Sequence, residues 1–340
     1  MLLRIVILCL VSNIVLGQSF THDELDVNIG GGFLLAHKKV IRHLPQEKPL
    51  FLDFSYTKYS ASLPNFGIGA NIISSGNASS IGNLYGIYGF TKLRLNQRDS
   101  TFKFKIGFGL GYISKIFDIN GNNKNNAIGS HWNSNVVFKL EKLFRLRNGS
   151  FFRLGGGLTH FSNGSFQTPN LGLNFFMIHV GYSFLKEKTK AVEAKPLKYD
   201  ENKKWNYGIA LRGGIRENFA PYRGKFPLLT FSLFSTYRQN HKRNIVGGFD
   251  CFYNPSVLYF SDDYSPIQLG LFIGKEWVLN QLILGIDMGG YIYDEYRDDG
   301  IFYQRLNIHT YMSKKLKLSF LLKSHWTVAQ VFQLGIGVDF

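Results

Sequence analysis

A histidine lies two residues before a serine in the segment LTHFSNGSFQTPNLGLNFF, residues 158–176. In a β-strand, side chains at positions i and i+2 point to the same side, so His160 and Ser162 are neighbours on one face. A neutral imidazole can accept the proton of a serine hydroxyl while that oxygen attacks a carbonyl carbon. The pair therefore predicts nucleophilic hydrolysis of an acyl bond.

Further polar residues near the pair could complete such a site. Asn174 begins the next apolar stretch and could hold the imidazole in its working tautomer. Asn163 could donate its side-chain amide to the oxyanion, helped by backbone N–H groups of the turn at Gly164. The predicted site thus has His160, Ser162 and Asn174 as catalytic residues. Because a His-x-Ser pair also arises by chance, the elements that carry it must support the prediction.

Strands with one apolar face are the elements that the sequence predicts. Residues 101–114, TFKFKIGFGLGYIS, place apolar side chains on one face and lysines and glycines on the other, and residues 132–144 and 332–340 follow the same pattern. Such stretches of about ten residues are typical of transmembrane β-barrels. A water-soluble β-sandwich would alternate in the same way.

Two features favour the membrane barrel over the soluble sandwich. The chain ends in an apolar strand closing on Phe340, which resembles the C-terminal recognition signal of bacterial outer-membrane barrels. Connections also alternate in length: 97–100 and 147–150 are short, whereas 115–129 and 163–173 are long. Short turns face the periplasm and long loops face outward in such barrels, so the His-x-Ser pair is expected at the external end.

Composition and charge fit an exported β-protein. The chain has 31 Phe, 18 Tyr and 36 Gly but only 9 Pro, a composition that suits strands. Its formal charge of +16 fits an anionic partner, and for an exported protein lipid phosphates suit better than nucleic acid. Lys38, Lys39 and Arg42 in the first external loop are the predicted substrate-binding residues. No nucleotide fingerprint or zinc spacing is present, so we expect no metal or cofactor.

The chain divides into four predicted segments. Residues 1–17 read as a secretory signal peptide whose apolar core is too short to span a bilayer. About eight strands are expected in a first barrel, residues 18–187, and about eight in a second, degenerate repeat, residues 205–340. The charged stretch 188–204 reads as a linker. Two tandem eight-stranded barrels are therefore expected, with a single barrel of about sixteen strands as the alternative.

The motif HFSN at 160–163, followed by PNLGLN at 169–174, resembles that of the outer-membrane lipid A 3-O-deacylases, also called the acyloxyacyl hydrolase family. The resemblance covers about residues 20–187. It implies an eight-stranded barrel whose seventh strand carries the histidine and serine and whose eighth strand begins with the third triad member. It also implies removal of an ester-linked acyl chain from lipopolysaccharide, with the bacterial outer membrane as the location and lipid A as the partner.

One departure from that family leaves other functions open. The family pattern has a glutamate where this chain has Asn174, and an amide can orient a histidine but cannot stabilise an imidazolium with negative charge. Outer-membrane phospholipase A, which the site also resembles, has an asparagine at this spacing, but its calcium-binding arginine and serine find no match after Ser162. A non-enzymatic barrel, either a pore or a lipopolysaccharide-binding scaffold, is the third possibility. In the second half the corresponding strand points His325 inward, so no second active site is expected.

Overall fold

The computed structural model describes residues 20–60, 65–95, 101–187, 204–218, 224–279, 282–297, 299–326 and 328–340. The expected signal peptide lies outside these residues, as does the expected linker apart from Lys204. In the described part of the chain, no helix is long and apolar enough to cross a membrane. Two short 3₁₀ helices, η1 (Lys39–Ile41) and η2 (Pro255–Tyr259), lie in loops.

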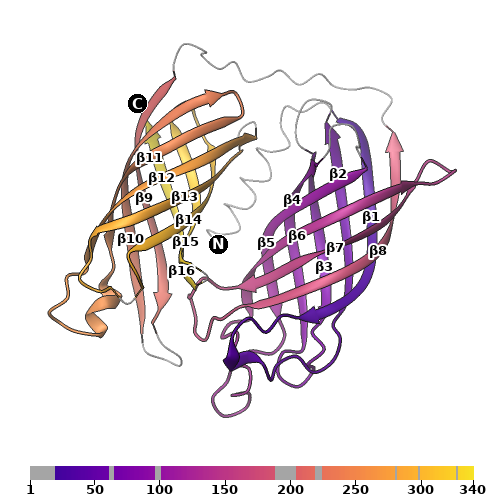
Figure 1. Cartoon of the computed structure of the whole chain (residues 1–340), viewed down its shortest axis with the longest axis horizontal. Helices are drawn as coiled ribbons and strands as arrows, with labels where there is room; N and C mark the ends of the chain where they lie inside the picture. The colour runs from indigo at the N-terminus through magenta and orange to yellow at the C-terminus, as the bar shows by residue number, and fades with distance from the viewer. Residues whose placement is uncertain are drawn as a thin grey trace. The chain divides into compact units, whose positions relative to one another are not determined.

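Eight strands form the first barrel (Figure 1). They are β1 (Phe20–Leu34), β2 (Leu50–Ser60), β3 (Asn65–Ser74), β4 (Asn83–Arg94), β5 (Phe102–Ile113), β6 (Trp132–Arg145), β7 (Phe151–Ser162) and β8 (Leu173–Glu187). Each strand pairs antiparallel with the next, and β8 closes the barrel by pairing with β1. Closure leaves no unpaired strand edge, which a β-structure in a bilayer requires.

The second barrel is closed in the same way, with β16 pairing to β9. Its strands are β9 (Trp205–Glu217), β10 (Lys225–Asn240), β11 (Arg243–Tyr253), β12 (Ile267–Leu279), β13 (Leu282–Tyr293), β14 (Phe302–Tyr311), β15 (Leu316–His325) and β16 (Val328–Asp339). The prediction of two tandem eight-stranded barrels is confirmed. The alternative of one sixteen-stranded barrel is wrong, because β8 pairs with β1 rather than with β9.

The outer surface of the first barrel is apolar. On β7 and β8 the exposed side chains include Phe152, Leu154, Phe176 and Ile178, whereas Arg153 between them is buried. Alternation of this kind places hydrocarbon outside and polar groups inside, as a barrel in lipid requires. The faces of these strands therefore follow the period of two seen in the sequence.

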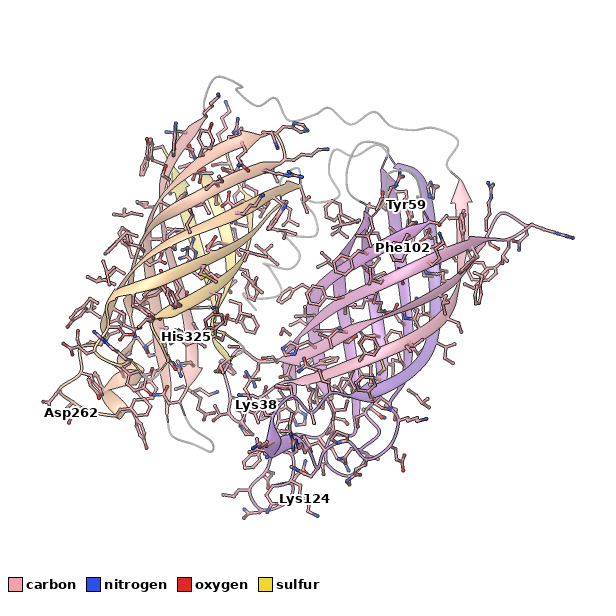
Figure 2. The ribbon with its side chains drawn as sticks, in the orientation of Figure 1. Lys38, Tyr59, Phe102, Lys124, Asp262 and His325 are labelled. Atoms are coloured by element: carbon pink, nitrogen blue, oxygen red, sulfur yellow. The ribbon has the colours of Figure 1, made fainter. Side chains whose placement is uncertain are left out.

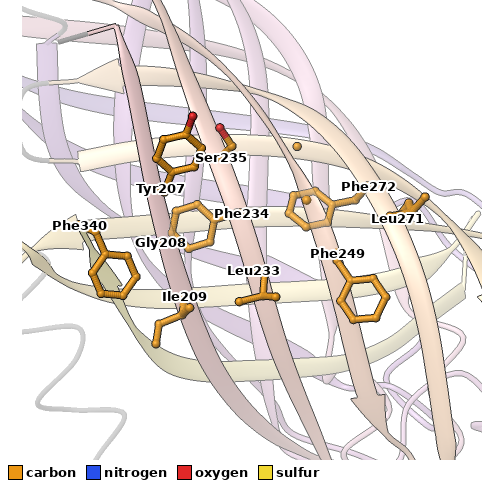
Figure 3. A pocket seen from close by; sticks show the side chains of 12 residues that line it. Tyr207, Gly208, Ile209, Leu233, Phe234, Ser235, Phe249, Leu271, Phe272 and Phe340 are labelled. Carbon is orange, nitrogen blue, oxygen red and sulfur yellow. The ribbon is translucent and has the colours of Figure 1, made fainter.

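The second barrel has a shallow apolar groove on its surface (Figure 3). The groove has a volume of about 700 Å³ and runs across β9, β10, β11 and β12. Its lining is apolar except for Tyr207 and Ser235, so it offers no nucleophile paired with a base.

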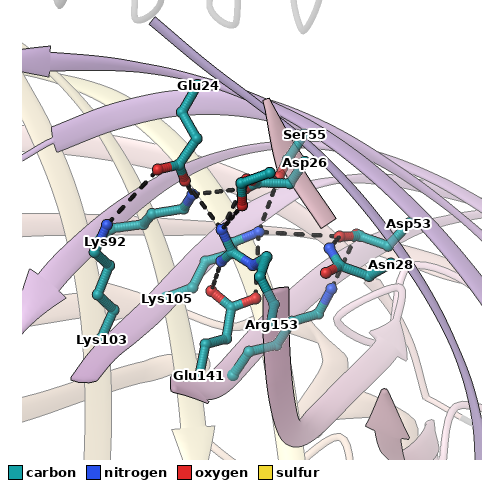
Figure 4. A network of polar contacts seen from close by, with 12 residues as sticks. Glu24, Asp26, Asn28, Asp53, Ser55, Lys92, Lys103, Lys105, Glu141 and Arg153 are labelled. Carbon is teal, nitrogen blue, oxygen red and sulfur yellow. Dashed lines mark hydrogen bonds and ion pairs between the residues drawn. The ribbon is translucent and has the colours of Figure 1, made fainter. Parts of the chain in front are cut away.

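Ion pairs fill the interior of the first barrel (Figure 4). Lys92 Nζ lies 2.6 Å from both Glu24 Oε1 and Asp26 Oδ2. Arg153 Nη1 lies 2.7 Å from Asp26 Oδ1 and 3.0 Å from Glu24 Oε1, and its other terminal nitrogen contacts Glu141. Buried charges are tolerated when each is paired and hydrogen-bonded, as these are.

Inward glycines leave room for the large side chains of this interior. A Cβ at Gly155 would lie 2.6 Å from His179 Nε2, and one at Gly111 would lie 2.5 Å from Phe161. Neither position can therefore carry a side chain without displacing a ring. An eight-stranded barrel has a bore just wide enough to be filled by side chains, and here it is filled. A bore filled in this way leaves the outer surface as the place for a substrate.

Long loops cap one end of the first barrel. Their apolar residues form a buried cluster with the ends of the strands, including Ile41, Leu44, Ile128 and Phe161. Polar contacts join the loops to one another: His43 Nε2 lies 2.7 Å from the Lys124 carbonyl, and Asn77 Nδ2 donates to the Leu44 carbonyl at 2.9 Å. Figure 2 shows Lys38 and Lys124 together at this end, with Tyr59 and Phe102 toward the other. The cap packs against the end of β7 through Phe161.

Candidate active site

The end of β7 places His160 and Ser162 on the outer face, beside the capping loops. Thr159 and Phe161 alternate with them and are buried toward the interior. The antiparallel register sets His160 directly opposite Asn174 on β8. Residues directly opposite in such a pair have Cβ atoms about 5 Å apart, so their side chains can meet. The structure thus brings His160 and Asn174 into contact, and Ser162 lies two residues farther along β7 on the same face. The catalytic roles of the three residues stay predictions.

The ring of His160 is held by Asn174. His160 Nδ1 lies 2.7 Å from Asn174 Oδ1, a strong hydrogen-bond distance. This contact occupies Nδ1 and leaves Nε2, on the other side of the ring, for a proton transfer. The backbone at Gly172 packs on the ring: its φ is +78°, and a Cβ there would lie 2.7 Å from His160 Cε1. Any residue larger than glycine at this position would push the imidazole aside.

The hydroxyl of Ser162 is hydrogen-bonded to Asn170. Ser162 Oγ lies 3.1 Å from Asn170 Nδ2 and 3.2 Å from Asn170 Oδ1. The backbone N–H of Asn163 donates to Asn170 Oδ1 at 3.0 Å, which fixes the amide with its oxygen toward that N–H. Asn170 Nδ2 is therefore a donor placed beside the serine oxygen. Sequence reasoning noted Asn170 as part of a motif but assigned it no role.

The loop that carries Asn170 is anchored to the loop before β6. Asn170 forms an isolated β-bridge with Ile128, and the Leu171 N–H donates to the Ala127 carbonyl at 2.9 Å. Ser162 is only 5 % exposed as a result. Its own carbonyl accepts a hydrogen bond from Ser134 Oγ at 2.7 Å. Ser162 is therefore enclosed between this loop and the end of β6.

The two residues predicted to form the oxyanion site differ in their surroundings. The side-chain amide of Asn163 donates to Ser130 Oγ at 2.7 Å, so it has a partner in the loop before β6. Gly164 follows in the left-handed conformation, with φ of +62°. A glycine adopts this φ without strain. The oxyanion roles of both residues stay predictions, and Asn170 Nδ2 is a further donor beside Ser162 Oγ.

The predicted substrate-binding residues lie in the loop between β1 and β2. Lys38 precedes the short helix η1, and Lys39 and Arg42 are exposed around it. Ile41 between them is buried in the apolar cap, which fixes this basic turn at the loop end of the barrel. Their binding of lipid phosphates stays a prediction.

The second barrel places its corresponding histidine inside. His325 at the end of β15 is 6 % exposed, and its Nε2 lies 2.9 Å from the Tyr291 hydroxyl. Ser324, the adjacent residue, points to the opposite face of the strand. Among the residues that the structure describes, no group of three or more histidine, cysteine, aspartate or glutamate side chains could hold a metal ion.

Two protein-family models match the chain. The model described as lipid A 3-O-deacylase (PagL) matches residues 52–183, and the model described as acyloxyacyl hydrolase, C-terminal domain, matches residues 205–340. No curated protein sequence matches the chain.

Solved structures similar to the chain include a porin and an iron transporter. A triple mutant of the Rhodopseudomonas blastica porin has 8 % identity and a TM-score of 0.21, with 94 % of this chain and 99 % of the porin covered. The FrpB iron transporter from Neisseria meningitidis has 8 % identity and a TM-score of 0.23, with 93 % of this chain and 68 % of the transporter covered. At these TM-scores the similarity supports no argument.

Proposed function

Since this chain belongs to the lipid A 3-O-deacylase family, we propose that it is a serine esterase of the bacterial outer membrane that removes an ester-linked acyl chain from lipid A. The observation that carries the proposal is the 2.7 Å contact between His160 and Asn174, with His160 two residues before Ser162 on the same face of a strand in a closed barrel. Membrane lipid reaches this face from the side, whereas the filled interior admits no substrate.

The first half of the reaction forms an acyl-enzyme. Asn174 Oδ1 accepts a hydrogen bond from the Nδ1–H of His160. The Nε2 lone pair of His160 can therefore take the proton of the Ser162 hydroxyl. The serine hydroxyl turns from Asn170 and attacks the ester carbonyl carbon. The tetrahedral intermediate then collapses, the acyl–oxygen bond to the sugar breaks, and His160 returns its proton to the sugar oxygen. The acyl chain remains bonded to Ser162 Oγ.

The second half releases the fatty acid. His160 takes a proton from water, whose oxygen attacks the acyl carbonyl, and then returns a proton to Ser162 Oγ as the ester bond breaks. Both halves place negative charge on the same carbonyl oxygen. Asn170 Nδ2 can donate to that oxygen, together with the predicted donors Asn163 and Gly164. Lys38, Lys39 and Arg42 bind the phosphates of the lipid A headgroup in this proposal.

The donor role of Asn170 gives a first prediction. In Asn170→Asp an oxygen can still accept from the Asn163 backbone N–H, which keeps the loop anchored, but the donor beside Ser162 is lost. We expect kcat to fall by about 100-fold or more, the effect of removing one oxyanion donor. Asn120→Ala, in an exposed loop, should retain full activity. Steady-state kinetics with purified protein in detergent measure both, and an Asn170→Asp enzyme as active as the wild type would remove Asn170 from the mechanism.

The choice of substrate is tested with two lipids. Purified protein in detergent is incubated with lipopolysaccharide, or with phosphatidylethanolamine in the presence and absence of calcium. The molecular masses of the lipids are then measured by mass spectrometry. We expect lipid A to lose one acyl chain without added calcium and the phospholipid to stay intact. Cleavage of the phospholipid that requires calcium would favour a phospholipase A. No cleavage of either lipid would favour a non-enzymatic barrel, and cleavage that survives Ser162→Ala would contradict Ser162 as the nucleophile.

A further inference from the structure

The amide of Asn174 creates a problem that a carboxylate would not have. A carboxylate accepts hydrogen bonds through both oxygens, whereas an amide has one accepting and one donating end. If Asn174 turned its nitrogen to His160, the ring would have to accept at Nδ1 and carry its proton on Nε2. Nε2 could then no longer accept the proton of Ser162. Activity therefore depends on which end of the amide faces the histidine.

A second histidine contacts the other end of this amide. His37 Nδ1 lies 3.0 Å from Asn174 Nδ2, and His37 Nε2 lies 3.1 Å from the carbonyl oxygen of Leu171. A carbonyl oxygen only accepts, so Nε2 of His37 carries a proton and Nδ1 of the neutral ring is a lone pair. The contact of His37 Nδ1 with the Leu35 carbonyl is longer, at 3.5 Å, and at that length it competes weakly.

These contacts fix the direction of each hydrogen bond. Because Nδ1 of neutral His37 can only accept, the Asn174 atom facing it must be the amide nitrogen. The amide oxygen then faces His160 Nδ1, which must carry the proton, and Nε2 of His160 is left as the base. This series of hydrogen bonds begins at the Leu171 carbonyl, which can only accept and which lies in the same loop as Asn170.

From this geometry we infer that His37 is a positioning residue, which holds the Asn174 amide in the orientation that makes His160 a base. The inference rests on the proposed esterase function. His37 touches no reacting atom and acts only through Asn174. A carboxylate at position 174 would present an accepting oxygen to His160 in either orientation. His37 gives the Asn174 amide the same property, because it fixes which end of the amide faces His160.

Local structure explains why His37 is available. β1 pairs with β8 as far as Leu34, and the Leu35 N–H then donates to the Asn174 carbonyl at 2.8 Å. This last backbone hydrogen bond holds the start of the loop beside Asn174. Two residues later, the side chain of His37 contacts the side chain of Asn174. The ring of His37 is exposed rather than part of the apolar cap, so its replacement should not disturb folding.

The test is a double-mutant cycle between positions 37 and 174. His37→Leu removes the acceptor and is made in the wild type and in the Asn174→Glu background. In the wild type we expect kcat to fall by about threefold to tenfold, the range that one neutral hydrogen bond contributes, with KM unchanged. In the Asn174→Glu background the same substitution should change kcat by less than about twofold, because a carboxylate has no wrong end.

A matched control lies in the same loop. His43→Leu removes a histidine that contacts the Lys124 carbonyl instead of the site, and it should leave kcat unchanged. Equal losses from His37→Leu and His43→Leu, or equal losses from His37→Leu in both backgrounds, would overturn the inference and leave the esterase proposal intact. A wild-type protein without deacylase activity, or activity that persists in Ser162→Ala, would instead overturn the proposed function itself.

Discussion

Ser162→Ala is expected to lower kcat for lipid A deacylation by about three orders of magnitude or more, because Ser162 Oγ carries the acyl group in the proposed mechanism. The change removes one oxygen from a buried position whose backbone carbonyl keeps its bond from Ser134. The barrel should therefore fold as in the wild type. Release of fatty acid from lipopolysaccharide, followed by mass spectrometry against time, measures the rate.

Two comparisons make this result decisive. Ser79→Ala removes an exposed hydroxyl at the same end of the barrel, which donates to Asn77, and should leave the rate unchanged. His160→Ala should lose about as much activity as Ser162→Ala, since the two residues act as a unit and their effects do not add. A Ser162→Ala protein that keeps a tenth or more of the wild-type rate would contradict the serine mechanism.

Arg153→Met is expected to destabilise the first barrel by about 3–5 kcal/mol, because each of three buried carboxylates loses one of its cations. Arg153 contacts Glu24, Asp26 and Glu141, all of which are fully buried. Methionine has a similar reach but no charge and no donors. The free energy of unfolding in detergent, measured with a denaturant, gives the change.

An exposed arginine provides the control for this substitution. Arg145→Met changes the same residue types at the end of β6, where the side chain is solvent-accessible, and should shift stability by less than about 0.5 kcal/mol. Similar stabilities for the two variants would show that the ion pairs of Arg153, drawn in Figure 4, make no net contribution to the stability of the fold.

The sequence alone predicts the strands and the faces of the proposed catalytic residues, because both follow from one local rule. Phe152, Leu154, His160 and Ser162 share the parity of one strand, so their common direction needs no knowledge of neighbouring strands. The count of strands in each half, together with glycines that make room inside a narrow bore, predicts two closed barrels.

Contacts made across loops could not be predicted in this way. Asn170 reaches Ser162 because its loop is tied to the loop before β6, and no local pattern reveals that tie. His37 meets Asn174 across 137 positions of sequence, and only closure of the barrel brings them together. The ion pairs of Arg153 have the same origin, since Glu24 lies 129 positions away. Spacing along the chain carries no information about such partners.

The reactive serine can be identified directly with a reagent that bonds covalently to activated serines. Purified protein in detergent is treated with a long-chain alkyl fluorophosphonate, whose phosphorus is attacked by serine oxygen with loss of fluoride, and its peptides are analysed by mass spectrometry. A lipid-facing esterase predicts one phosphonylated residue, Ser162, and loss of that label in His160→Ala. A protein that deacylates lipopolysaccharide while Ser162 stays unlabelled, or that carries the label on another residue, would contradict Ser162 as the nucleophile.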